Sequence, residues 1–448
     1  MSFARYPQYK HSGVEWLGQV PAHWNVIPLK FIANVQTGVA KGKDNSLQET
    51  ILVPYLRVAN VQDGYLDLDT IAEIEIPVDD LPRYQLQKGD VLMNEGGDFD
   101  KLGRGHIWDA SIEPCIHQNH VFAVRPHGVS PVWLNAITGS QYAQFYFMTR
   151  SKQSTNLASI SSTNLMELPV ILPPTTEQTQ IAAFLDRETA KIDGLVAEQR
   201  RLMALLKEKR QAVISHAVTR GLNPDAPMKP SGIEWLGDVP AHWGVTPLKY
   251  VVHLRSGGTP SKANLAYWNG DVPWASSKDL KVEALSDSQD HITQSAVDDG
   301  AAELVPAGSL LIVVRGMILI HSFPVVKALV PMAINQDLKA LTPDAKLDVD
   351  FLAWLLRGSL RETLGRIDEA AHGTKVLRLE AWTSMALPVP PIDEQLAIVR
   401  SIIDDMNKFD TLTAEALRAI DLLQERRTAL ISAAVTGQID VRSAVASA

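Results

Sequence analysis

Polar and basic side chains collect in two loop-like stretches of the sequence, and their chemistry suits hydrogen bonds to base edges or phosphate groups. Both stretches are rich in glycine, as in "EGGDFDKLGRG" and "SGGTPSK". The candidates are Arg57, Asn60, Asn94, Lys101, Arg104, Gln118 and Asn119 in the first stretch, and Thr259, Lys262, Ser277, Lys278, Arg315, Asn335 and Gln336 in the second. A solvated loop residue is the alternative for any single position, whereas two matching sets indicate two ligand-binding surfaces.

Catalytic and metal-binding patterns are not evident in this sequence. Cys115, His117 and His120 could suggest zinc, but structural zinc takes four convergent ligands, and no second pair accompanies them. The segment "GVAKGKD" has the wrong spacing for a phosphate-binding loop. A glycine fingerprint for a dinucleotide or methyl donor is absent, and so is an Asn/Asp-Pro-Pro-aromatic motif for amino methylation. We therefore expect a non-catalytic chain with no metal site and no cofactor of its own.

Composition places the chain among globular proteins with several domains. It has 448 residues, 46% of them hydrophobic, and one cysteine, which fits a reducing compartment. The most apolar run, "LLIVVRGMILI", is interrupted by Arg315 and too short to span a bilayer, so we expect a cytoplasmic protein. The net charge of −9 disfavours DNA binding by the isolated chain and suggests that a partner supplies part of the positive field.

The sequence segments expected to position these residues occur twice in the chain. "EWLGQVPAHW" (15–24) returns as "EWLGDVPAHW" (234–243), 219 positions further along. "PPTTEQTQI" (173–181) returns as "PPIDEQLAI" (390–398), now 217 positions further. Between these blocks the register persists while the side chains change; Gly96, for example, aligns with Arg315. The chain is thus two homologous halves that share a frame and differ in what the frame holds.

Each half ends in a segment that predicts a long helix. No proline occurs from 177 to 219, and apolar residues recur at helical spacing. A helix of about 43 residues would be roughly 65 Å long and must bury its apolar stripe, most simply against its own copy in an antiparallel pair. Two unrelated core helices are the alternative. The expected interface residues are Ile181, Leu185, Ile192, Leu195, Leu202, Leu206 and Val213, with Ile398, Ile402, Phe409, Leu412, Ala419, Leu423 and Leu430 in the second copy.

Together these blocks resemble the specificity subunit of type I restriction–modification systems. The resemblance rests on "SGxEWLGxVPxHW" opening each half, "SGGTPSKANLAYWNGDVPW" (256–274), and "LPVxxPPxxEQ" before each long helix, and it covers nearly the whole chain. It implies that each variable region is a target recognition domain reading one part of a bipartite, asymmetric DNA sequence. It also implies that the helices set the spacer and dock two methyltransferase subunits, which restriction subunits join.

The expected fold class is α/β, with two α/β target recognition domains in pseudo-two-fold arrangement joined by an antiparallel coiled coil. The expected boundaries are 1–170 for the first domain, 171–220 for the first long helix, 221–230 for a linker, 231–389 for the second domain, 390–437 for the second long helix, and 438–448 for a tail returning to the first domain.

Several alternatives remain open at this stage. Gln118 and Gln336 occur in both halves, so they suit a framework hydrogen bond or a common phosphate contact as well as base reading. The expected partners are double-stranded DNA, two methyltransferase subunits and restriction or translocase subunits, with no membrane. S-adenosylmethionine, ATP and Mg²⁺ are expected on those partner subunits. The alternative function is a non-catalytic coiled-coil scaffold whose two ligand-binding domains are not directed at DNA.

Overall fold

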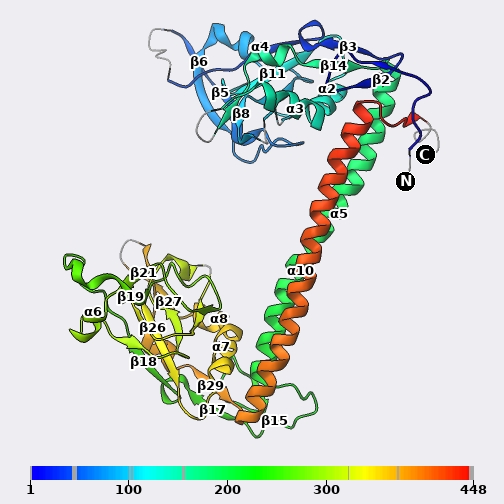
Figure 1. Cartoon of the computed structure of the whole chain (residues 1–448). Helices are drawn as coiled ribbons and strands as arrows, with labels where there is room; N and C mark the ends of the chain where they lie inside the picture. Colours follow the sequence, from blue (N-terminus) through cyan, green and yellow to red (C-terminus); the bar gives the residue numbers. More distant parts are fainter. Residues whose placement is uncertain are drawn as a thin grey trace. The chain divides into compact units, whose positions relative to one another are not determined.

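The computed structural model describes residues 3–42, 48–99, 102–103, 105–153, 157–320, 322–370 and 373–442. The chain divides into two compact units. Unit 1 combines residues 1–199 with the C-terminal residues 417–448, and unit 2 is the continuous stretch 200–416. Two long helices, α5 (Thr175–Arg220) and α10 (Ile392–Val435), each contribute one segment to each unit (Figure 1).

Unit 1 is built on a four-stranded antiparallel sheet with the order β4-β11-β7-β9 and a three-stranded sheet with the order β10-β5-β6. The strands of these sheets are β4 (Ala33–Thr37), β5 (Thr50–Leu56), β6 (Ala72–Pro77), β7 (Val91–Asn94), β9 (Gly105–Ile107), β10 (Ile116–His117) and β11 (Val121–Pro126). Helix α2 (Pro131–Thr138) contacts β7, β9 and β11, so its Trp133 and Leu134 join the main apolar core of the unit.

Smaller elements complete unit 1. They are the strand pairs β1 (Tyr9–His11) with β2 (Gln19–Pro21) and β3 (Asn25–Pro28) with β14 (Pro169–Leu172), the strands β8 (Gly96–Gly97), β12 (Lys152–Gln153) and β13 (Ala158–Ser159), and the helices α1 (Leu81–Tyr84), α3 (Gln141–Arg150) and α4 (Ser162–Met166).

Unit 2 repeats this plan. Its five-stranded sheet has the order β18-β26-β23-β24-β20, and its four-stranded sheet has the order β21-β19-β25-β22. The strands are β18 (Val252–Ser256), β19 (Trp268–Ala275), β20 (Ala284–Leu285), β21 (Asp290–Ile292), β22 (Leu304–Val305), β23 (Leu310–Val313), β24 (Val325–Ala328), β25 (Met332–Ile334) and β26 (Leu338–Pro343). The order β4-β11-β7 in unit 1 therefore corresponds to β18-β26-β23 here.

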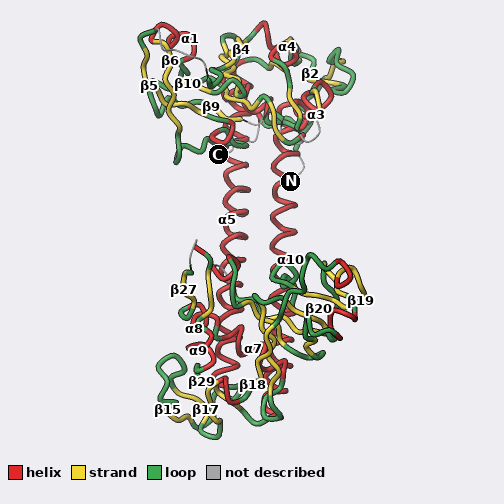
Figure 2. The backbone as a smooth tube through the Cα atoms, turned by 90° about the vertical axis from the view of Figure 1, so that its left-hand side faces the viewer, coloured by secondary structure: helices red, strands yellow, loops and turns green. Residues whose placement is uncertain are grey.

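Helices cover the sheets of unit 2 as they do in unit 1. Helix α7 (Val349–Gly358) packs on β24 and β26, and its N-cap Asp348 accepts hydrogen bonds from the backbone of Asp350 and Phe351. In each unit the strands lie next to that unit's segments of the long helices (Figure 2). The remaining elements are β15 (Met228–Pro230), β16 (Asp238–Pro240), β17 (Gly244–Pro247), β27 (Ile367–Glu369), β28 (Lys375–Leu377), β29 (Ala386–Val389), α6 (Gln294–Asp298), α8 (Leu360–Leu364) and α9 (Leu379–Thr383).

Helices α5 and α10 pack together along a heptad seam. On α5 the buried or half-buried seam is Ile192, Val196, Gln199, Met203, Leu206, Arg210 and Val213, and on α10 it is Ile402, Met406, Phe409, Thr413, Ala416, Ile420, Leu423, Arg427 and Leu430. The alternating steps of four and three are the coiled-coil repeat. Among the helices of the described residues, none combines the length and apolarity needed to cross a membrane.

Seven of the fourteen predicted interface residues lie on this seam. Three others, Ile181, Leu185 and Ile398, are buried in the apolar cores of the units, and Ala419 is half-buried beside the seam. The predictions of Leu195, Leu202 and Leu412 are wrong, because these side chains are 50%, 42% and 45% exposed and flank the seam. The physical reason is that polar residues occupy some of the seam positions. A search for regularly spaced apolar residues therefore selected leucines that stand one position away from the seam. Because each residue turns a helix by about 100°, one step of displacement carries a side chain off the seam.

Ion pairs at equivalent positions set the register of the two helices. In unit 1, Arg427 Nε lies 3.0 Å from Asp193 Oδ1. In unit 2, Arg210 pairs with Asp410. Asp410 and Arg427 stand 217 positions after Asp193 and Arg210, so the repeat supplies the same bridge to each unit with the roles of α5 and α10 exchanged. Both bridges require antiparallel helices.

The two repeated sequence blocks fasten each long helix to its domain, which explains why they occur twice. In unit 1, Glu177 accepts hydrogen bonds from Trp24 Nε1 at 3.0 Å and lies 2.6 Å from His23 Nε2. In unit 2, Glu394 accepts from Trp243 Nε1 at 3.0 Å and lies 2.8 Å from His242 Nε2. We call each of these groups a latch. The "AHW" and "EQ" motifs are therefore two halves of one contact.

Residues 438–442 lie against the first domain. Ala4 and Asp440 form an antiparallel bridge, and Tyr9 Oη donates to the carbonyl of Gly437 at 2.9 Å. A Cβ on Gly437 would lie 2.4 Å from Pro21 and 2.9 Å from Trp24, so only glycine fits this junction. The first and last segments of the described chain thus build one unit.

Candidate nucleic-acid interface

In each unit one tight turn collects the ends of three strands, and we call it the hub turn (117–120 in unit 1, 334–337 in unit 2). In unit 1 the hub turn exchanges backbone hydrogen bonds with Val39, Leu56 and Glu95, at 2.8 to 3.1 Å. In unit 2 it does so with Gly258, Ala275 and Val314, at 2.8 to 2.9 Å. Each residue of the second set stands 219 positions after its counterpart, so the two hubs have the same backbone frame.

A glycine allows close approach to each hub turn. A Cβ on Gly38 would lie 2.0 Å from the carbonyl oxygen of His117, and one on Gly257 would lie 2.2 Å from the carbonyls of Ile334 and Asn335. No side chain can be accommodated at such distances without moving the backbone. Gly38 and Gly257 are again 219 positions apart.

The candidates of unit 1 lie around its hub, but they do not all face outward. Asn60 is 3% exposed; its carboxamide accepts from Arg57 N and donates to the carbonyls of Asp67 and Thr70. It therefore orders the loop that carries the half-buried Arg57, which differs from the direct ligand contact we expected. Gln118 accepts weakly from Val58 N at 3.4 Å, so its side chain also supports this loop.

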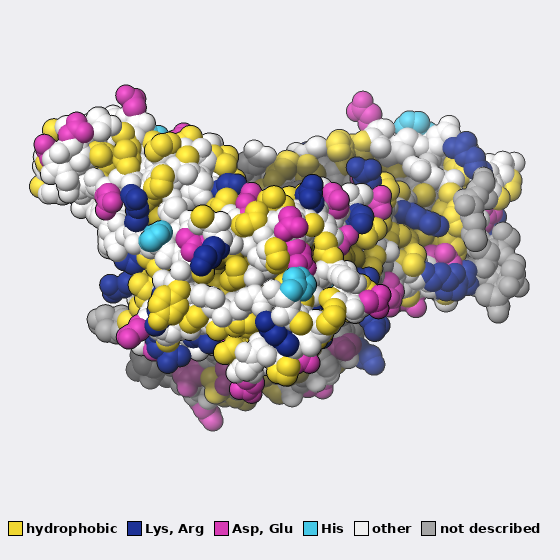
Figure 3. All heavy atoms as spheres, turned by 90° about the horizontal axis from the view of Figure 1, so that it is seen from below, with side chains coloured by type: hydrophobic (Ala, Val, Ile, Leu, Met, Phe, Trp, Pro, Cys, Tyr) yellow, Lys and Arg dark blue, Asp and Glu magenta, His cyan; other side chains and the backbone are white. Residues whose placement is uncertain are grey.

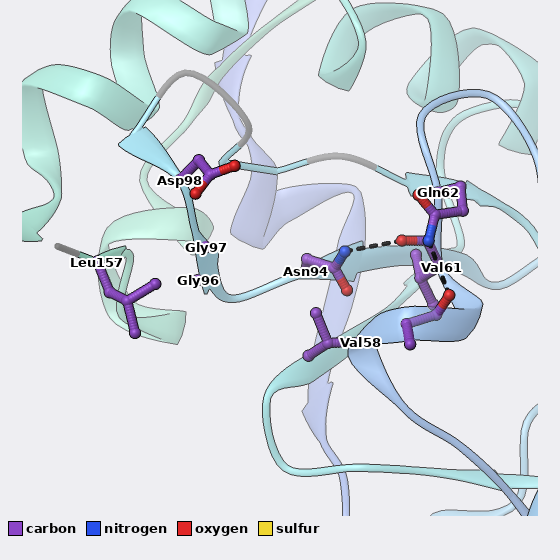
Figure 4. Close-up of a pocket in the computed structure, with 9 residues that line it drawn as sticks. Val58, Val61, Gln62, Asn94, Gly96, Gly97, Asp98 and Leu157 are labelled. Carbon is purple, nitrogen blue, oxygen red and sulfur yellow. Dashed lines mark hydrogen bonds between the residues drawn. The ribbon is translucent and has the colours of Figure 1, made fainter. Parts of the chain in front are cut away.

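Asn94 lines a cavity of about 260 Å³ beside the hub of unit 1 (Figure 4). Its side chain donates to the carbonyl of Val61 at 2.8 Å, while its Oδ1 is buried without a hydrogen-bond partner among the described residues. Gly96 and Gly97 form another wall, which leaves the cavity without side chains on that side. Lys101 and Arg104 were also predicted here, but they lie outside the described residues.

A second cavity of about 500 Å³ adjoins the first and contains residues that the sequence did not single out as ligand contacts. Glu95 and His120 line it, and His120 Nδ1 lies 2.9 Å from the Glu95 carboxylate. Lys152 and Gln153 of β12 line the same cavity. Asn119 contacts this group, with Nδ2 at 3.4 Å from His120 Nε2. The position of Glu95 after a central strand was the signal in the sequence, since it aligns with Val314.

The candidates of unit 2 also gather at the hub. Thr259 bonds Gln336 across the hub turn, and Asn335 caps that turn by accepting from Asp337 N at 3.2 Å. Ser277 and Lys278 follow β19, and Lys278 Nζ lies 2.7 Å from Asp290. Arg315 follows β23 and is exposed. The loop residue Lys262 is exposed as well.

Cys115, His117 and His120 of unit 1 differ in their exposure to solvent. Cys115 is buried, and burial raises the pKa of its thiol to about 12. His117 is buried with Nδ1 2.7 Å from the carbonyl of Val121, and burial lowers its pKa. His120 is exposed. Among the described residues no group of three or more His, Cys, Asp or Glu side chains is placed to hold a metal ion.

Charge on the visible surface is mixed. On the face shown in Figure 3, Lys and Arg side chains lie among Asp, Glu and hydrophobic side chains instead of forming one large basic area. Base-edge contacts need only a few directed donors and acceptors, whereas strong non-specific binding needs many phosphate contacts. The mixed charge on this face provides no broad basic area for general attraction to a polyanion.

Comparison with known proteins gives consistent matches. The family model described as type I restriction modification DNA specificity domain matches residues 21–200 and 240–421. The EcoR124I/EcoR124II specificity subunit of Escherichia coli is 30% identical over 279 residues, 60% of this chain and 62% of that relative, so the match spans less than two thirds of its length. The putative MjaX specificity subunit of Methanocaldococcus jannaschii is 22% identical over 438 residues, 95% of this chain and 96% of the relative. A solved structure concerning assembly and conformational transition of the type I R-M system shares the fold, with a TM-score of 0.67, 15% identity, and coverage of 93% of this chain and 98% of that one.

Proposed function

Because the chain belongs to the type I restriction modification DNA specificity domain family, we propose that its two hubs read the two parts of a bipartite, asymmetric DNA sequence. The family model matches both halves, and a specificity subunit is a non-catalytic component of its complex. The alternative of a scaffold not directed at DNA receives no support from these matches.

The observation that carries the proposal is the pair of equivalent hubs with different side chains. Two domains that read different sequences need the same frame, because both face the same kind of double helix. They need different donors and acceptors, because each base pair presents its own pattern in the major groove. At the hubs the frame is repeated, while Asn94, Glu95 and Gly96 are replaced by Val313, Val314 and Arg315.

Residues shared by both hubs take a different role in this proposal. Gln118 and Gln336 stand in corresponding hub turns, so they suit phosphate contact or support of the frame. Arg57, Lys262 and Lys278 suit phosphate contact because their charges lie on loops around the hubs. Double-stranded DNA binding by a chain of net charge −9 is then completed by basic surface on partner subunits.

The long helices are proposed to set the spacer and to dock two methyltransferase subunits. The exposed leucines beside the seam support docking, because they occur as repeat-related pairs. Leu195 corresponds to Leu412 and Leu205 to Leu422, and their exposed fractions are 50%, 45%, 52% and 57%. Each unit carries one member from α5 and one from α10. A surface present twice fits a partner present in two identical copies.

Chemistry is assigned to the partners in this proposal. Methyl transfer with S-adenosylmethionine, and ATP- and Mg²⁺-dependent restriction, would belong to the methyltransferase and restriction subunits. The polar groups at the hubs of this chain would contact the DNA and position it.

The test is a genome-wide map of methylated adenines in the source strain, with the gene intact and deleted. We expect a split, asymmetric motif that disappears on deletion. Affinity purification of the chain is done in parallel, and we expect a methyltransferase subunit to co-purify at two copies per chain. The proposal would be contradicted if the complex assembles and is active in the intact strain but deletion of the gene leaves the methylation map unchanged.

A further inference from the structure

The corner that follows the central strand has the same backbone in both units, and we call it the notch (94–97 with 158–160 in unit 1, 313–316 with 375–377 in unit 2). Gly97 and Gly316 have φ of +151° and +149°. Gly96 pairs with Ser159, and Arg315 forms a bridge with Val376. Ile160 N donates to the carbonyl of Glu95, and Leu377 N donates to that of Val314, each at 2.9 Å. The notch thus belongs to the repeated frame next to each hub.

The notch of unit 1 contains two polar side chains. Asn94 lines the 260 Å³ cavity, but it is 6% exposed and its Oδ1 is itself buried, without a partner among the described residues. The carboxylate of Glu95 lines the adjoining cavity. Figure 4 shows the Asn94 side chain beside the corner formed by Gly96 and Gly97. Glycine at position 96 adds no side chain to this corner, and the Glu95 carboxylate lies 2.9 Å from His120 Nδ1.

The notch of unit 2 presents a donor instead. Arg315 stands where Gly96 stands in unit 1, and it is exposed. Within the described part of the chain its guanidinium has no ion-pair or hydrogen-bond partner, whereas Arg255, Arg357 and Arg366 of the same unit are paired with Glu303, Glu283 and Glu362. The strand before it ends in Val313, so the acceptor of unit 1 is replaced by an apolar side chain.

This difference separates base reading from phosphate contact. Both units would bind the same phosphodiester backbone, so a cation used for phosphate contact at the notch is expected in both. Lys152 lines the cavity of unit 1 from β12, but the position shared by Gly96 and Arg315 carries a cation in unit 2 alone, and a cation at that position is expected to read a feature that differs between the two half-sites. Arginine most often reads guanine, because its two parallel N–H groups match the O6 and N7 acceptors in the major groove.

We propose that Arg315 is a specificity-determining residue that reads a guanine in the half-site of unit 2. The notch of unit 1 has glycine at this position, so the same contact is absent from the other half-site. This inference rests on the proposed function and assigns one base, a guanine, to one half-site of the target.

The experiment uses the assembled complex of this chain with its methyltransferase subunits and the target found by methylation mapping. Duplexes carry 7-deazaguanine at one guanine of the unit 2 half-site at a time, which removes the N7 acceptor and keeps base pairing. We expect one position at which the analogue weakens binding by wild-type complex, within the range of about 5- to 150-fold that a bidentate arginine–guanine pair supplies. Arg315→Ala should bind natural and analogue duplexes equally.

Matched variants separate reading from charge and folding. Arg361→Ala removes the same charge from an exposed position on α8 and should keep the wild-type response to the analogue. Arg315→Lys keeps the charge but loses the two-pronged geometry, so discrimination should fall while salt dependence is retained. If Arg315→Ala responds to the analogue as wild type does, or if it weakens binding to every sequence equally, the inference is overturned. Neither result would affect the proposed function, which fails only if the wild-type complex does not select the target.

Discussion

Removing the latch carboxylate should destabilise unit 1 more than unit 2, although the latch motifs are repeated in sequence. Glu177 accepts from Trp24 Nε1 and from Tyr6 Oη at 3.3 Å, lies 2.6 Å from His23, and its side chain is 10% exposed. Glu394 serves Trp243 and His242, and its side chain is 28% exposed. The same substitution therefore leaves two buried donors unpaired in unit 1 and one, Trp243 Nε1, in unit 2.

The expected magnitudes follow from these contacts. An unsatisfied buried donor costs about 1–3 kcal/mol, so Glu177→Ala should lower the free energy of unfolding of unit 1 by about 2–5 kcal/mol. Glu394→Ala should lower that of unit 2 by about 1–2 kcal/mol, because it leaves one such donor unpaired instead of two. For units of this size the larger loss corresponds to a fall in Tm of roughly 5–15 °C.

Hydrogen exchange read by mass spectrometry suits this comparison, because it reports protection in each unit separately. Calorimetry on the same variants gives the change in Tm. Glu177→Gln is the matched control, since its amide oxygen can still accept from Trp24, and it should lose less stability than Glu177→Ala. Equal losses for Glu177→Ala and Glu394→Ala, or for the Ala and Gln variants of Glu177, would refute the reasoning.

Three further outcomes can be measured. Val196→Asp places a charge in the seam, where the side chain is 8% exposed, and should lower the free energy of thermal unfolding by about 3–5 kcal/mol. The neighbouring Leu195→Asp should change stability by less than about 0.5 kcal/mol, so a loss of methyltransferase co-purification in that variant would report docking alone. Equal destabilisation by the two variants would contradict the seam. Burial lowers the pKa of His117, so below a pH of about 6.5 the unfolded state binds a proton that the folded state does not, and stability decreases as the pH is lowered. His117→Asn should reduce the loss of stability between pH 7 and pH 5. An unchanged dependence of stability on pH would contradict this prediction. Cys115, with its pKa raised to about 12, should resist iodoacetamide in the folded protein and react after denaturation, as mass spectrometry of the peptide would show.

Much of the frame could be predicted from the sequence because repetition carries information that one copy lacks. The offset of 217 between the two helical segments predicted both helices, and the structure places them at Thr175–Arg220 and Ile392–Val435. The shared blocks also predicted a common framework. Their direct contact, Trp24 with Glu177, escaped prediction, because nothing in spacing alone says which repeated blocks touch.

Side-chain roles at the hubs were less predictable. Asn60 has the type and position of a base-reading residue, yet its amide is used up by the carbonyls of its own loop. The seam was displaced by one residue near Val196 because Gln199 and Arg210 occupy seam positions. In both cases the outcome depends on local hydrogen bonds and ion pairs between segments distant in sequence, which composition and periodicity do not record.

The bridge between Ala4 and Asp440 has a consequence for the order in which a ribosome-bound chain can fold. Unit 2 is continuous from 200 to 416, so all of its residues are synthesised before the C-terminal segment of unit 1. Unit 1 waits for residues 417–448, although most of it is synthesised first. Domains generally fold as units during synthesis, with the N-terminal one first. Here the domain whose synthesis begins first is completed after the other, because its apolar core also contains Ala434, Val435 and Val441.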